Sequence, residues 1–184
     1  MTCAEQQGSL DGLCGVYAVV NAVKRLVPRH LNRELLDELF RELMTTLITR
    51  RGPKVVADGA AAADIRQMLL RANRFLARRL PAAAFEFSRL SGRGRRRPRT
   101  IDALWQILNA QIEESGQRTV AILAWGSPYA EHWTCVHHVT SRSLRITDSR
   151  GNSVLSRSRL KLGEHPDRRS AVHPTDVFFV RRLP

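Results

Sequence analysis

The chain has 184 residues, of which 43% are hydrophobic and 26% charged, as in a folded globular protein rather than a disordered one. This length suits one domain with a substantial core, and no apolar run is long enough for a membrane-spanning helix, so we expect no membrane partner. The formal net charge of +13 keeps nucleic acid among the partners to consider.

The three cysteines are Cys3, Cys14 and Cys135, and none belongs to a Cys-x-x-Cys pair. Their odd number and spacing favour neither a disulfide scaffold nor a structural zinc site. We expect no metal ion and no other cofactor. The N-terminus lacks the basic and then apolar pattern of a secretory signal, which predicts a reduced, cytoplasmic protein and leaves signal-less export open.

Hydrophobic periodicity predicts three helices in the first half of the chain. The first begins at or next to Cys14 and carries valines at three-and-four spacing. The second covers about residues 32–50 and has Asn32 as its N-cap. The third covers about residues 61–80 and ends before Pro81. Their apolar stripes are typical of core-facing helices.

A basic block separates this helical part from the rest of the chain. It contains Arg93, Arg95, Arg96, Arg97 and Arg99. The glycines and the proline among them predict an exposed loop, and no aromatic residues alternate with the arginines, as a stacking platform for single-stranded nucleic acid would need. A solvated loop is the favoured interpretation, and nucleic-acid binding is the alternative.

The second half changes to strand periodicity around one further helix. That helix begins after Thr100 and ends before Gly116. Strands are predicted at 85–90, 118–125, 132–140 and 143–148 and near the C-terminus. The order predicts an α+β fold, with N-terminal helices packed on a mainly antiparallel C-terminal sheet. We expect a single domain over residues 1–184, helical at about 14–80 and sheet-forming at about 85–184.

Cys14 stands at the expected start of the first helix. A thiol at this place meets unpaired N–H groups and the positive end of the helix dipole, and both favour the reactive thiolate. A free cysteine is more often a small buried core residue. The position of Cys14 alone therefore leaves both interpretations open.

A cysteine nucleophile needs a base within hydrogen-bond reach and a third group that orients the base. His132 opens one predicted strand and Asp148 ends the next. If these strands pair as a hairpin around residue 140, His132 and Asp148 lie opposite each other near the same end. The alternatives are an exposed strand histidine and an ordinary turn carboxylate.

Together these residues resemble the papain-like cysteine peptidase superfamily. The order is a glutamine, Cys-Gly at a helix start, His-Trp on a strand and an aspartate at the end of the next strand. The pattern is most similar to the double-glycine (bacteriocin-leader) peptidases. It is also similar to the Josephin deubiquitinases, which carry a helical insertion after the nucleophile helix. The resemblance covers the chain from Gln6 to Asp148 and implies a papain-like fold.

The resemblance also implies roles for individual residues. Cys14 would be the nucleophile, His132 the general base and acid, and Asp148 the orienting residue. In such enzymes a glutamine upstream of the cysteine helps to form the oxyanion hole. Gln7 is the equivalent here and Gln6 the alternative, because Gln7 lies seven residues before Cys14 and the usual spacing is six. The preceding Asp-Gly-Leu-Cys also matches the D-G-x-C motif of ovarian-tumour deubiquitinases.

The activity that the resemblance implies is that of a thiol hydrolase, which cleaves a peptide or isopeptide bond through a thioester. The expected partner is a protein or peptide substrate, such as a ubiquitin-like protein or a leader peptide. The same type of centre also serves deamidases and acyltransferases. The alternatives are a basic nucleic-acid-binding module and a catalytically silent papain-like domain that binds proteins.

Overall fold

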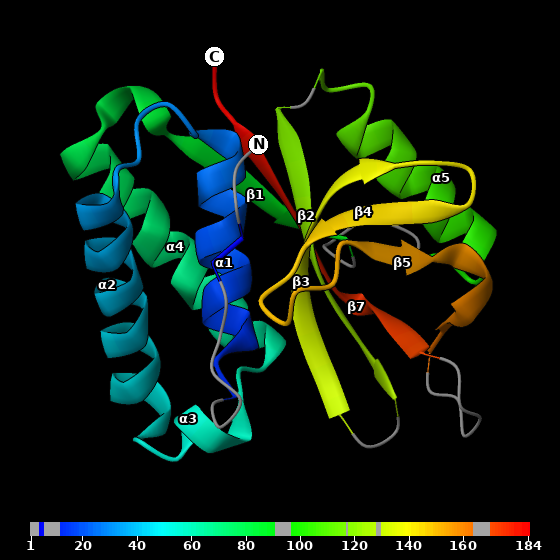
Figure 1. Ribbon diagram of the computed structural model, residues 1–184, viewed down its shortest axis with the longest axis horizontal. Coiled ribbons are helices and arrows are strands. Elements are labelled where there is room, and N and C mark those ends of the chain that lie inside the picture. The colour runs from blue at the N-terminus through cyan, green and yellow to red at the C-terminus, as the bar shows by residue number, and fades with distance from the viewer. Residues whose placement is uncertain (1–3, 6–11, 91–96, 117, 128–129, 164–169) are drawn as a thin grey trace.

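The computed structural model describes residues 4–5, 12–90, 97–116, 118–127, 130–163 and 170–184. Helices occupy most of the first half of the chain, and strands most of the second (Figure 1). The fold class is therefore α+β with a mainly antiparallel sheet, as the sequence predicts. Within the described residues, no helix combines the length and the apolar character that crossing a membrane requires.

Three helices match those expected in the first half: α1 (Cys14–Leu26), α2 (Arg33–Arg51) and α4 (Ala62–Arg79). The side chain of Asn32 caps α2 as predicted, since its oxygen accepts a hydrogen bond from Leu35 N at 2.9 Å. A short helix, α3 (Val55–Asp58), lies between α2 and α4. It was not predicted, because four residues are too few to show a helical period.

The second half contains α5 (Ile101–Ile112) and the 3₁₀ turns η1 (Pro81–Ala83) and η2 (Arg157–Arg159). Thr100 caps α5 by accepting a hydrogen bond from Ala103 N at 3.1 Å. The helix ends at Ile112, earlier than predicted, and the turn that follows leads to Gly116, whose φ of 63° favours glycine.

The strands of the described residues form one seven-stranded sheet in the order β1-β7-β2-β3-β4-β5, with neighbours along this path antiparallel, and β6 pairs with β7 in parallel. They are β1 (Phe85–Arg89), β2 (Thr119–Ser127), β3 (Ala130–Val139), β4 (Ser143–Thr147), β5 (Val154–Ser156), β6 (Leu160–Leu162) and β7 (Ser170–Arg182). The short strands β5 and β6 were not predicted.

Both faces of the sheet are covered by helices. Figure 1 shows α1, α2 and α4 on one side of the sheet and α5 on the other. Alternate residues of β2 serve the two sides: Val120, Ile122 and Ala124 belong to the core under α1, whereas Ala121 and Leu123 belong to the core under α5. This arrangement places the start of α1 against the central strands.

The hairpin of β3 and β4 has a different register from the one predicted. Cys135 pairs with Thr147, so the ladder, if extended, would place Asp148 level with Thr134 rather than His132. A register shift between Val136 and His138 brings Asp148 one residue nearer to His132 but does not remove this offset. His132 is also the third residue of β3, not its first. The expectation that His132 and Asp148 are opposite in the ladder is therefore wrong.

Candidate active site

Cys14 is the first residue of α1, as predicted, and is 6% exposed. Its thiol makes a long hydrogen bond of 3.9 Å to the carbonyl oxygen of Gly12. The helix therefore presents its N-terminal end to the sulfur, where the helix dipole favours a negative charge.

Two glycines allow the chain to approach closely around Cys14. A Cβ at Gly12 would lie 2.8 Å from the carbonyl oxygen of Ala57, and the Gly12 N–H donates to Val56 O at 2.6 Å. A Cβ at Gly15 would lie 2.8 Å from the Cβ of Ala60. Because side chains at both positions would collide, α3 and Ala60 hold the start of α1 tightly.

Trp133 follows the candidate histidine and belongs to this support. Its ring is 3% exposed, and its Nε1 donates to Ala60 O at 2.7 Å. The tryptophan is therefore a core residue that ties β3 to the segment after α3. The resemblance to papain-like peptidases implies that Trp133 is a wall of the cleft, and its burial does not fit that role.

His132 and Asp148 are in direct contact although they are not opposite in the ladder. Both are buried, and His132 Nε2 is hydrogen-bonded to Asp148 Oδ1. The second carboxylate oxygen, Oδ2, accepts a hydrogen bond from Asn152 Nδ2 at 2.6 Å. Asn152 was not predicted as a site residue; its place in the turn after Asp148 was the available signal.

Charge, rather than burial, decides the protonation of this pair. Burial lowers the pKa of His132, but the hydrogen bond to Asp148 and the nearby Cys14 outweigh it and raise the pKa to about 9. Burial raises the pKa of Asp148, but His132 and Asn152 outweigh it, so this pKa lies below its usual value. The pair therefore favours an imidazolium beside a carboxylate.

The structure thus brings Cys14, His132 and Asp148 together. Cys14 lies close enough to His132 to raise the pKa of the imidazole. With Nε2 bound to Asp148, the second ring nitrogen, Nδ1, is buried and has no hydrogen-bond partner among the described residues. The arrangement can hold a proton at Nδ1 while Asp148 binds the opposite side of the ring.

Trp125 completes the surroundings of His132 and was not predicted. The two residues are directly paired across β2 and β3. Their rings are nearly perpendicular, at 87°, with centroids 5.9 Å apart. An aromatic ring in this place shields one side of the imidazole from water.

Most of the other predicted residues fall outside the described part of the chain. Gln6, Gln7, Arg93, Arg95 and Arg96 lie outside the described residues. Arg97 and Arg99 are described and exposed. Among the residues that the structure describes, no group of three or more His, Cys, Asp or Glu side chains could hold a metal ion.

The opposite end of α1 carries a second polar cluster. Arg25 Nε donates to Thr147 Oγ1 at 2.8 Å, and Arg25 Nη2 donates to His137 Nε2 at 3.2 Å. Burial and the positive charge of Arg25 lower the pKa of His137 to about 4. Burial raises the pKa of the adjacent Cys135 thiol to about 12, so this thiol stays protonated.

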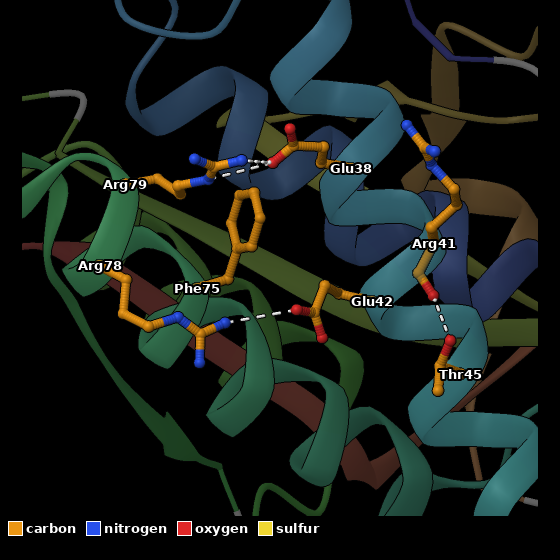
Figure 2. Close-up of a pocket in the computed structure, with 7 residues that line it drawn as sticks. All are labelled: Glu38, Arg41, Glu42, Thr45, Phe75, Arg78 and Arg79. Atoms are coloured by element: carbon orange, nitrogen blue, oxygen red, sulfur yellow. Dashed lines mark hydrogen bonds and ion pairs between the residues drawn. The ribbon is translucent and has the colours of Figure 1, made fainter.

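A groove between α2 and α4 lies apart from these residues (Figure 2). Its lining residues are Glu38, Arg41, Glu42, Thr45, Phe75, Arg78 and Arg79. Arg79 is paired with Glu38 and Arg78 with Glu42, the latter at 3.3 Å. Because these opposite charges neutralise each other, we assign the groove no chemistry.

In comparisons with known proteins, no family model matches the chain and no curated protein matches it.

Proposed function

We propose that the protein is a thiol hydrolase of papain-like fold that cleaves a peptide or isopeptide bond through Cys14, His132 and Asp148. One observation carries this proposal: a buried histidine is hydrogen-bonded through one ring nitrogen to a buried carboxylate, while its other ring nitrogen has no described partner and a helix-terminal thiol lies nearby. These are the three roles that nucleophilic catalysis by a thiol needs.

The reaction follows from these roles. Because the raised pKa leaves His132 protonated, the Cys14 proton is held at His132 Nδ1, and the Cys14 thiolate attacks the substrate carbonyl carbon to give a tetrahedral oxyanion. His132 returns the proton to the leaving amine as the C–N bond breaks and a thioester forms. Water then attacks the thioester and gives its proton to His132. The thiolate leaves and recovers the proton, and a carboxylic acid is released.

Asp148 acts by holding the imidazole. Its bond to Nε2 fixes the tautomer that keeps Nδ1 free for the thiol, and its charge stabilises the imidazolium that forms. Asn152 in turn fixes the carboxylate through Oδ2. Asp148 is therefore a positioning residue, and its loss should cost less than the loss of His132.

The oxyanion needs donors near the sulfur. The N-terminal end of α1 supplies a favourable dipole and the backbone N–H of Cys14. By resemblance, Gln7 is proposed as the side-chain donor, with Gln6 as the alternative. Replacing each glutamine by alanine in turn tests this assignment.

The arrangement of elements supports the papain-like part of the proposal. The nucleophile lies on a helix packed against an antiparallel sheet, and the base and the orienting residue lie on β3 and directly after β4. Cys14 and Cys135 are free thiols, which suits the proposed reduced, cytoplasmic setting. Protein or peptide substrates are proposed. Deamidation and acyl transfer would use the same centre.

The proposal is tested by hydrolysis of a positional-scanning mixture of tetrapeptidyl aminocoumarin amides by the wild type and by Cys14→Ala. We expect hydrolysis by the wild type and its loss in Cys14→Ala, with an unchanged circular dichroism spectrum. Cys135→Ala is the matched control, because Cys135 is also a free cysteine but lies in the core, and it should remain active. Full hydrolysis by Cys14→Ala would contradict the proposed mechanism.

A further inference from the structure

Trp125 has an unexplained polar atom beside the candidate base. Among the described residues, the buried side-chain nitrogen and oxygen atoms without a hydrogen-bond partner are Trp125 Nε1 and His132 Nδ1. Buried polar atoms are normally hydrogen-bonded, and an unsatisfied one destabilises the fold. The proposed mechanism gives His132 Nδ1 its task. It gives none to Trp125 Nε1.

The other two tryptophans of the chain show the normal situation. Trp105 Nε1 donates to Thr140 O at 2.6 Å, and Trp133 Nε1 donates to Ala60 O at 2.7 Å. Each of these rings is at most 4% exposed. Trp125 is instead half-buried, and its N–H has no hydrogen-bond partner in the part of the chain that the structure describes. The difference points to a partner that arrives from outside the chain.

The strand beside Trp125, β7, is irregular. β2 follows β7 up to the pair Leu123–Val177 and resumes at the pair Trp125–Val172, so β7 bulges between these positions. Arg89 holds the bulge through the carbonyl oxygen of Thr175 and through Asp176 Oδ1, the latter at 3.1 Å. The extra residues belong to β7, so the bulge changes the strand beside Trp125 and not the backbone of β2 itself.

An indole N–H can only donate a hydrogen bond, so its partner must be an acceptor. A peptide substrate offers a carbonyl oxygen at every residue. We propose, on the basis of the proposed function, that Trp125 is a substrate-binding residue whose Nε1–H donates to a substrate carbonyl oxygen beside the reacting bond. Its direct pairing with His132 places the donor next to the proton-transfer centre.

The test compares Trp125→Phe with the matched control Trp105→Phe. The readouts are kcat/KM on the best-cleaved member of the coumarin amide mixture, the rate of Cys14 alkylation by iodoacetamide at pH 6, and Tm. Phenylalanine keeps an aromatic ring beside His132 and removes the donor. We expect Trp125→Phe to lower kcat/KM about tenfold, to change alkylation less than about twofold, and to leave Tm unchanged or higher.

Trp105→Phe should give the opposite pattern, because it removes a hydrogen bond that is already made: a lower Tm with kcat/KM within about twofold of the wild type. The inference is overturned if Trp125→Phe keeps the wild-type kcat/KM, if alkylation falls as much as hydrolysis, or if its Tm falls as in Trp105→Phe. A wild type without hydrolysis, or an active Cys14→Ala, overturns the proposed function itself, whatever Trp125→Phe does.

Discussion

The two ends of α1 place two histidines of the same strand in opposite electrostatic settings. Burial lowers the pKa of both His132 and His137. Near the start of α1, Asp148 and Cys14 reverse this effect and raise the pKa of His132 to about 9. Near the end of α1, Arg25 adds to it, and the pKa of His137 falls to about 4. The charge of the partner, not the degree of burial, decides which histidine carries a proton at neutral pH.

The two buried cysteines also differ in their surroundings at the two ends of α1. Cys135 is fully buried within the core, and burial raises the pKa of its thiol to about 12. Cys14 lies instead at a helix N-terminus next to His132, and the raised pKa of His132 favours the charged imidazolium. Only the first end of α1 therefore joins a thiol to a base. The second end is a hydrogen-bonded brace between α1, β3 and β4.

The largest expected effect comes from replacing His132, near the start of α1. His132→Ala should lower the rate of Cys14 alkylation by iodoacetamide at pH 6 by about 100-fold, because the thiol loses its base. His137→Gln should leave this rate within about twofold of the wild type, because glutamine can still accept the bond from Arg25. Mass spectrometry of the alkylated peptide measures both. Equal losses in the two variants would refute the distinction.

A smaller effect is expected from replacing Asp148, which together with Cys14 outweighs the effect of burial on the pKa of His132. Asp148→Asn removes the negative charge that raises the pKa of His132, so this pKa should fall from about 9. Cys14 alkylation at pH 6 should slow by about tenfold, less than in His132→Ala. The decrease in hydrolysis rate at alkaline pH, which reports loss of the His132 proton, should move to lower pH. An unchanged decrease would show that another group sets it.

The smallest effect concerns stability, and its sign differs between the two ends. The raised pKa of His132 adds stability below pH 6.5 that is lost as pH rises through about 9. The lowered pKa of His137 means stability that is present above pH 6.5 and lost as pH falls through about 4. Urea unfolding of the wild type and of His132→Gln and His137→Gln checks this. His132→Gln should reduce the pH dependence of the free energy of unfolding at alkaline pH, and His137→Gln should reduce it at acid pH. The opposite result would contradict both pKa directions.

Local sequence signals predicted the long elements of the fold well. The stripe after Cys14 and the caps Asn32 and Thr100 gave helix starts within one or two residues of those observed, because they depend on nearby residues alone. The segments α3, β5 and β6 were missed. Each has only three or four residues, which is too short for a periodic pattern.

The sequence predicted that Cys14, His132 and Asp148 lie together, but not the geometry or the neighbours of this candidate site. The contact between His132 and Asp148 was expected from an incorrect register; it forms because the two side chains meet beyond the last pair of the ladder. Asn152 and Trp125 were missed, since one depends on a turn and the other on a neighbouring strand. Contacts of this kind are set by tertiary packing, which sequence periodicity does not encode.

The separation of Cys14 from its base along the chain has a consequence for synthesis. Cys14 and His132 are more than one hundred residues apart. At about 5–20 residues per second, the ribosome adds His132 on the order of 10 s after Cys14. Until then the nascent chain holds an ordinary thiol without a base. The proposed thiol reactivity should therefore arise only when the sheet has packed against α1, so that the growing chain does not carry the proposed nucleophile in an active form.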